Sequence, residues 1–230
     1  MLKNTLEYRF KKRVLAIDPG IRTGCKVVCL NANGRLLSHE VIFPQKNPTE
    51  SQRILTYFVK TYDIEAIAIG NGTASRESEI FVSDTLKEIP NEVYYAIVSE
   101  AGASVYSASK LATEEYPDIN VSIRGAISIA RRLQDPLAEL VKIDPKAIGV
   151  GQYQHDVNQK RLAESLTGVV EDAVNNVGVD VNTATPSLLS YVSGINGTIA
   201  KNIVKYRDEN GEIKERKELL KVPKLGPAAY

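Results

Sequence analysis

A short aliphatic run that ends in a carboxylate constrains the fold of this chain more than any other feature. Val14-Leu-Ala-Ile leads into Asp18, and Pro19-Gly20 follow directly and force a turn. The pattern predicts a central strand whose last residue emerges at the edge of a sheet. Ligands of open α/β sheets collect at the carboxyl ends of strands, so Asp18 is a candidate ligand for a metal or a phosphodiester. Alternatively, Asp18 accepts backbone N–H groups within the turn.

Strand-like and helix-like segments alternate after this first strand. Two further strands joined by a tight turn at Asn33-Gly34 complete a three-strand meander. The alternation beyond it predicts βαβ crossovers and a partly parallel sheet. The other predicted strands are 25–30, 35–43, 66–70 and 93–98, and the predicted helices are 48–62 with Asn47 as N-cap, 76–89, 104–115 and 122–141, the last interrupted near Pro136.

These segments group into four parts. A basic N-terminal extension (residues 1–13) precedes an α/β domain (14–145), a connector with a long amphipathic helix (146–180) and a small all-α domain (181–230). From Pro186 onward the chain has eight Lys and Arg residues against five acidic ones, although its net charge is only +1. A mildly basic tail fits an appendage that binds a polyanion, but so small an excess also arises by chance.

Composition excludes several classes of protein. No run of about eighteen apolar residues is present, and the basic N-terminus lacks a hydrophobic segment. We therefore expect neither a membrane span nor a signal peptide, and we place the protein in the cytoplasm. Cys25 and Cys29 are the only cysteines, and only two histidines accompany them, which argues against a zinc site. We expect no resident metal and no cofactor.

Two of the predicted strands lead into carboxylates. Asp18 ends the first strand and Glu100 follows the strand 93–98. This layout resembles the ribonuclease-H-like fold, in which two such carboxylates and a third acid on a late helix hold two divalent metals around a phosphodiester. Here the late helix has Arg124 where the third acid is expected, and a guanidinium cannot ligate a cation. We therefore expect Asp18 and Glu100 to be vestigial. The alternative is a structure-selective nuclease of the Holliday-resolvase type that uses both acids with Mg²⁺ or Mn²⁺.

Two other features allow more than one interpretation. The loop Gly70-Asn71-Gly72-Thr73 lies between a strand and a helix and is a candidate phosphate-binding loop. Alternatively it is a tight turn in which Thr73 or Ser75 caps the helix. Arg131 and Arg132 either contact phosphate or pair with acids near the end of their own helix.

The sharpest pattern lies near the C-terminus. Residues 189–207 resemble a helix-hairpin-helix motif, in which a Gly-hydrophobe-Gly hairpin joins two short helices and the second helix begins with exposed amides. Such amides bind a nucleic-acid phosphate without selecting a base. The residues expected to bind nucleic acid are Gly194, Ile195, Asn196, Gly197 and Thr198 of the hairpin and the flanking Lys201 and Lys205. The alternative is a helical hairpin that only packs against protein.

Two positions depart from the usual hairpin. Ser193 stands where Pro is usual, and Asn196 stands where a second Gly is usual, although Asn tolerates a left-handed backbone. Residues 219–229 repeat the first half of the motif. We expect the second helix of this second hairpin to be truncated at Tyr230.

Several motifs together resemble the Tex family of bacterial transcription accessory proteins. They are Asp18–Gly24, Gly70–Glu77, Ser99–Ser107, Arg124–Leu137 and Gly149–Asp156. The resemblance implies a YqgF (ribonuclease-H-like) domain that does not cut, followed by the start of a helix-hairpin-helix domain. It also implies a factor that binds RNA or DNA and acts with the transcription machinery. The family's N-terminal helical region and C-terminal OB-fold domain would lie outside this sequence.

Overall fold

The computed structural model describes residues 11–226, which form two compact units that divide between Glu139 and Leu140. The first unit contains a β-sheet with helices, and the second contains helices without a sheet. Most of the predicted N-terminal extension and the last residues of the second hairpin, 1–10 and 227–230, lie outside the described residues.

The first unit is built on a five-stranded mixed sheet with the order β3-β2-β1-β4-β5. The strands are β1 (Val14–Asp18), β2 (Cys25–Leu30), β3 (Leu36–Ile42), β4 (Ala66–Gly70) and β5 (Tyr94–Val98). β1 pairs antiparallel with β2 and parallel with β4, so Asp18 lies at the carboxyl end of the central strand. The predicted meander and parallel crossovers are confirmed, and each strand lies within one residue of its predicted bounds.

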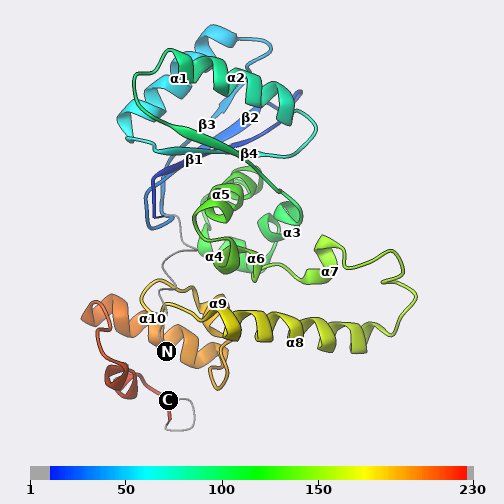
Figure 1. The fold of residues 1–230 in the computed structure, drawn as a ribbon, viewed down its shortest axis with the longest axis vertical. Coiled ribbons are helices and arrows are strands. Elements are labelled where there is room, and N and C mark those ends of the chain that lie inside the picture. Colours follow the sequence, from blue (N-terminus) through cyan, green and yellow to red (C-terminus); the bar gives the residue numbers. More distant parts are fainter. Residues whose placement is uncertain (1–10, 227–230) are drawn as a thin grey trace. The chain divides into compact units, whose positions relative to one another are not determined.

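Helices cover both faces of this sheet, as Figure 1 shows. α1 (Pro48–Thr61) and α2 (Ser75–Lys87) lie on one face, and α5 (Val121–Gln134) lies on the other. The side chains buried between α1, α2 and the sheet include Leu15, Ile17, Leu55, Val59, Ile67 and Val82. Those buried between α5 and the sheet include Val14, Ala16, Val28, Ala126, Ile127 and Ala130. Burial on both faces explains why β1 and β4 are continuous apolar runs in the sequence.

The predicted helix 104–115 is two short helices in the structure. These are α3 (Ala103–Ser107) and α4 (Lys110–Glu115). Ser109 separates them and caps α4, because its side-chain oxygen accepts a hydrogen bond from the Ala112 N–H at 3.1 Å. The helical periodicity was continuous in the sequence, but the local hydrogen bond of Ser109 starts a new helix there.

The predicted helix 122–141 is also divided. α5 stops at Gln134, and the short α6 (Pro136–Leu140) follows it. Pro136 lacks the N–H that would continue the hydrogen bonding of α5, which accounts for the break.

The predicted N-cap of α1 is in place but does not cap the helix with its side chain. Asn47 occupies the N-cap position and makes no side-chain capping hydrogen bond.

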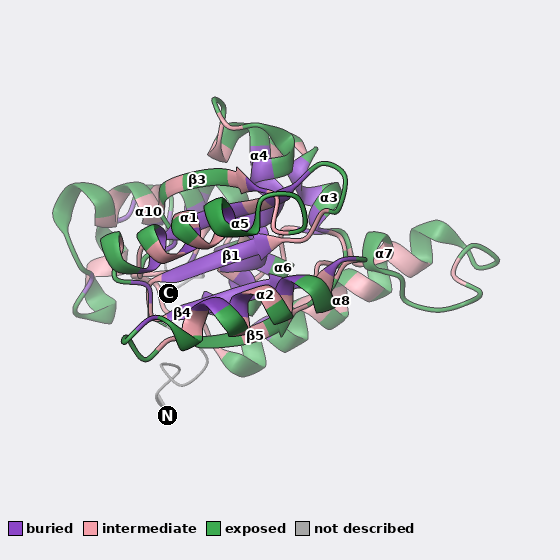
Figure 2. Cartoon of the chain, turned by 90° about the horizontal axis from the view of Figure 1, so that it is seen from above, coloured by how far each residue is buried: buried purple, intermediate pink, exposed green. Residues whose placement is uncertain are grey.

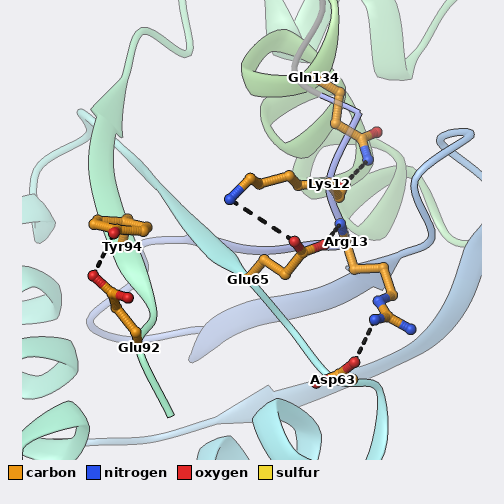
Figure 3. A network of polar contacts seen from close by, with 7 residues as sticks. All are labelled: Lys12, Arg13, Asp63, Glu65, Glu92, Tyr94 and Gln134. Atoms are coloured by element: carbon orange, nitrogen blue, oxygen red, sulfur yellow. Dashed lines mark hydrogen bonds and ion pairs between the residues drawn. The ribbon is translucent and has the colours of Figure 1, made fainter.

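A polar network fixes the segment that enters β1, and Figure 3 shows it. The Arg13 N–H donates to the Glu65 carboxylate at 3.1 Å, and the Lys12 ammonium lies 3.8 Å from the same carboxylate. The Gln134 amide donates to the carbonyls of Lys12 and Asn31, both at 2.8 Å. The end of α5 is therefore tied to the start of the strand that carries Asp18 at its other end.

The second unit consists of short helices around one long helix. They are α7 (Pro145–Ile148), α8 (Gln159–Val177), α9 (Pro186–Leu189), α10 (Gly197–Asn210) and a 3₁₀ helix at Arg216–Lys221. The Asn175 amide of α8 donates to the Tyr191 carbonyl at 3.0 Å, and its oxygen accepts from the Ser193 N–H at 3.1 Å. Asn175 thus holds the loop between α9 and α10. Among the described residues, no helix has both the length and the hydrophobicity that a membrane crossing requires.

Candidate functional site

A pocket of about 510 Å³ lies at the carboxyl edge of the sheet. Asp18 at the end of β1 and Glu100 in the turn after β5 both line it, so the structure brings together the two predicted acids. The rest of the lining comes from α3, from α5 and from its N-cap residue, and it consists of Ala103, Ser104, Ser107, Asn120, Val121, Ser122, Gly125 and Ile129.

The pocket perturbs the Asp18 carboxyl group. Burial and, to a smaller extent, the nearby charge of Glu100 raise the pKa of Asp18 from 3.8 to about 6, while the positive charge of Lys26 opposes the rise. One carboxylate oxygen of Glu100, Oε2, is buried and has no hydrogen-bond partner among the described residues. A buried carboxylate oxygen without a donor is costly, so the pair would gain from a proton or a cation between them.

The glycine loop after β4 holds Glu100 rather than a phosphate. A Cβ atom added to Gly70 would lie 2.7 Å from Glu100 Oε2, and one added to Gly72 would also collide with the Glu100 carboxylate. The Glu100 N–H donates to the Asn71 side-chain oxygen at 3.0 Å. A phosphate over this loop would meet a carboxylate, which argues against the interpretation of Gly70-Asn71-Gly72-Thr73 as a phosphate-binding loop.

The alternative interpretation of that loop needs correction too. The residue at the N-cap of α2 is Ala74, and the helix start has no side-chain capping hydrogen bond. Neither Thr73 nor Ser75 caps the helix. The glycines are required because the Glu100 side chain occupies the space above them, a long-range contact that no local sequence pattern reports.

Arg124 does not lie in the acidic pocket, which corrects the prediction that it takes the position of the third acid. Its guanidinium donates to the Tyr116 carbonyl at 3.1 Å and to the Thr113 hydroxyl at 2.9 Å. The residue of α5 that faces Asp18 is Gly125, since a Cβ atom added there would lie 3.8 Å from Asp18 Oδ2. The other residues of α5 that line the pocket are Val121, Ser122 and Ile129, so α5 supplies no carboxylate to it.

Arg132 was a candidate for a phosphate contact or an ion pair, but its observed role in the site is different. One of its guanidinium nitrogens, Nη1, donates to the carbonyls of Ser99 and Ala101 at 2.7 and 2.8 Å, on either side of Glu100. Arg132 therefore holds the turn that presents Glu100. The neighbouring Arg131 donates to the Gly34 carbonyl at 3.2 Å and is used in structural contacts as well. No local pattern in the sequence reports this role, because the Ser99 and Ala101 carbonyls lie more than thirty residues from Arg132 and meet it only in the folded chain.

The helix-hairpin-helix element adopts the predicted turn. Gly194 has a positive φ of 82°, and the Ile195 N–H donates to the Val192 carbonyl at 3.0 Å. Asn196 is the N-cap of α10, with φ −87° and an extended backbone. Asn196 therefore does not adopt the left-handed conformation for which glycine is usual at this position. Its tolerance of that conformation plays no part in this hairpin.

The N-terminus of α10 opens onto a shallow pocket of about 430 Å³. Its lining residues are Asn196, Gly197, Thr198, Lys201 and Asn202. The Asn196 side-chain oxygen accepts hydrogen bonds from the N–H groups of Thr198 and Ile199, both at 3.0 Å. Gly197 has open space where a side chain would stand. A bound anion would reach the Gly197 N–H, the Thr198 hydroxyl and the Lys201 ammonium at this end of the helix.

Lys205 lies one turn further along α10 than Lys201. Its ammonium is 3.8 Å from the Glu209 carboxylate in an exposed i,i+4 pair. Exposed pairs of this kind are weak, so Lys205 remains able to face a polyanion. Arg207, in contrast, donates to the carbonyls of Val181 and Ala184, both at 2.8 Å, and fastens α10 to the preceding loop.

The described part of the second hairpin repeats the geometry of the first. Lys224 has a positive φ of 68° and corresponds to Gly194, and the Leu225 N–H donates to the Val222 carbonyl at 3.2 Å, as Ile195 does to Val192. The short echo in the sequence is therefore a structural repeat. The expected truncated second helix lies outside the described residues.

Two families of known domains match this chain. The Tex protein YqgF-like domain matches residues 12–134, and the helix-hairpin-helix motif matches residues 174–230. The chain is 56% identical over 223 residues to Protein tex of Bordetella pertussis and 55% identical over 217 residues to the transcriptional accessory protein Tex of Neisseria gonorrhoeae. These matches cover 95% and 94% of this chain but 28% of each relative.

A human protein is related as well. The S1 RNA-binding domain-containing protein 1 of Homo sapiens is 43% identical over 224 residues, which cover 95% of this chain and 22% of the human protein. The chain thus spans less than a third of the length of these relatives. Its α/β unit has the ribonuclease-H-like mixed sheet with flanking helices, and its second unit has the helical hairpin. With the YqgF-like match covering more than half of its residues, the chain belongs to the Tex family of transcription accessory proteins.

Proposed function

We propose that this chain is a nucleic-acid-binding module of a Tex-like factor, and that it binds the backbone of RNA or DNA with little sequence preference. The relative from Neisseria gonorrhoeae is named a transcriptional accessory protein, which supports a role of the whole factor with the transcription machinery. We further propose that the factor acts in the cytoplasm. The observation that carries the proposal is the accessible N-terminus of α10 with Gly197, Thr198 and Lys201 around one shallow pocket. Contacts of this type bind backbone phosphates, which are the same in every nucleotide sequence.

The α/β unit contributes a surface but, on this proposal, no cleavage. A two-metal mechanism needs enough carboxylates to hold two hard cations at the attacking and leaving oxygens. The pocket offers Asp18 and Glu100, and the facing position on α5 is Gly125. Among the described residues, no group of three or more His, Cys, Asp and Glu side chains is placed to hold a metal. The residues present therefore do not fit a two-metal centre.

The proposal is tested with the salt dependence of binding. Labelled duplexes and single strands of unrelated sequence are titrated with the protein at several salt concentrations. Lys201→Ala and Lys205→Ala should each weaken binding to all sequences alike and reduce the slope of log K against log salt by about 1. Lys60→Ala, at an exposed position of α1, is the matched control and should leave the slope unchanged. If the two α10 variants bind as the wild type does, the hairpin is not the contact.

A second candidate function is a nuclease dependent on Mg²⁺ or Mn²⁺. The raised pKa of Asp18 and the unpartnered Glu100 oxygen favour it, because both would be relieved by a cation. Branched and single-stranded substrates are incubated with the protein and either metal. Cleavage that Asp18→Asn abolishes would establish this function. If no cleavage appears while binding is retained, the binding module stands alone.

A further inference from the structure

The connector between α7 and α8 exposes an unusual number of apolar side chains. Ile148, Val150, Tyr153 and Val157 are 42%, 42%, 70% and 49% exposed. Figure 1 shows that the connector extends beyond the N-terminal end of α8, and Figure 2 colours most of it as exposed. Apolar residues gathered on one exposed segment indicate a surface that binds another molecule.

The connector has a defined structure despite its exposure. The Val150 N–H donates to the Gln154 side-chain oxygen at 2.9 Å, and the Gln154 amide donates to the Lys146 carbonyl at 3.2 Å. The Gln159 amide donates to the carbonyls of Gln154 and Val157 at 2.7 and 3.0 Å. Polar side chains thus turn inward to bind the backbone while the Tyr153 ring faces solvent. A ring held on an ordered loop is ready to stack against a planar group at a low cost in entropy.

Two positively charged residues lie in the first turn of the helix into which the connector leads. Gln159, which bonds to the loop, is the first residue of α8, and Lys160 and Arg161 follow it, both exposed. The first turn of α8 contains no acidic residue. Cations at this end of a helix oppose its dipole, so Lys160 and Arg161 do not stabilise the helix. A local arrangement that works against stability points to a role in binding.

From these features we propose that the connector binds single-stranded nucleic acid, with a base stacked on Tyr153 and the adjoining phosphates paired with Lys160 and Arg161. The inference rests on the proposed function and adds a second contact to it. An exposed aromatic ring on an ordered segment that leads into two exposed cations is complementary to a strand whose bases are free to stack. In a duplex the bases are paired and stacked on one another, so this contact should distinguish single strands from duplexes.

The test compares Tyr153→Ala and Tyr153→Phe in the whole chain, using fluorescence anisotropy with oligothymidylate and with a duplex of equal length. Tyr153→Ala should weaken single-strand binding about tenfold and leave duplex binding unchanged, whereas Tyr153→Phe should bind as the wild type does. Tyr57 is 56% exposed on α1, and Tyr57→Ala serves as the matched control. Equal losses for single strand and duplex, or no loss with Tyr153→Ala, would overturn the proposal.

A second measurement reports on stacking itself. The chain contains no Trp, so Tyr153→Trp introduces a single reporter on the connector. Its fluorescence should be quenched by oligothymidylate but not by the duplex, and the Lys160→Ala, Arg161→Ala double variant should need several times more oligonucleotide for the same quenching. A response to neither nucleic acid refutes stacking and would favour a protein partner for this surface. Because the α10 lysines are intact in all these variants, failure here leaves the hairpin contact standing.

Discussion

The raised pKa of Asp18 predicts that this residue destabilises the fold at neutral pH. The carboxyl group ionises near pH 3.8 in the unfolded chain and near pH 6 in the folded one. Between these values the folded state binds more protons than the unfolded state, so the free energy of unfolding falls as pH rises through this window. Above pH 6 both states are ionised, and the loss is complete.

The size of the effect follows from the shift. One pKa unit corresponds to about 1.4 kcal/mol, so a rise from 3.8 to about 6 sets an upper limit of roughly 3 kcal/mol. Asp18 is partly exposed to solvent, which screens its charge, so we expect about 2 kcal/mol. Asp18→Asn removes the charge and should therefore stabilise the first unit by about 2 kcal/mol at pH 7 and by much less at pH 4.

Urea denaturation followed by circular dichroism at pH 4, 5, 6 and 7 measures this difference. The exposed Asp118 lies in the same unit, and Asp118→Asn, which removes a charge at the surface, is the matched control. The reasoning would be refuted if Asp18→Asn gained no stability over the wild type between pH 4 and pH 7. A gain that is equal at every pH would also contradict it, because it would not come from ionisation.

Two further predictions concern the second hairpin and the turn that carries Glu100. Lys224→Gly should stabilise the second hairpin by about 0.5–1 kcal/mol, because glycine adopts the positive φ of this position without strain. Thermal denaturation measures the gain. Lys221→Gly in the adjoining 3₁₀ helix is the control and should not stabilise the protein. Arg132→Met should lower the free energy of unfolding by about 2–4 kcal/mol, because it leaves the Ser99 and Ala101 carbonyls unpaired. It should also change the pKa of Asp18, measured by carboxyl ¹³C NMR, because Glu100 would shift. An unchanged Asp18 titration would show that Arg132 does not position Glu100.

The strands and the meeting of the two acids were predictable because they follow from local patterns. β1 and β4 are continuous apolar runs bounded by turn residues. β1 and β5 both run parallel to β4, which lies between them, so the carboxylates at their ends meet at one edge of the sheet. The direction of a side chain on a helix was not predictable in the same way. Arg124 and Gly125 are neighbours in the sequence, and only the rotation of α5 on the sheet decides which of them faces Asp18.

The role of the glycine loop was not predictable from the sequence for a related reason. Its pattern fits a phosphate cradle, but the group that occupies it is Glu100, which lies about thirty residues away in the sequence and approaches through strand pairing. The breaks at Ser109 and Pro136 divide helices whose apolar periodicity continues across them. Capping and proline chemistry act on single positions there, so a periodicity measured over many residues does not detect them.

The Asn196 cap has a consequence for how the hairpin would hold a polyanion. Its side-chain oxygen already accepts hydrogen bonds from two amides of α10, so a phosphate that seeks those amides competes with a resident acceptor. Binding then exchanges one acceptor for another, and the net gain is smaller than at an uncapped helix end. If the hairpin binds phosphate as proposed, the resident cap should therefore favour fast dissociation of the bound strand over tight retention.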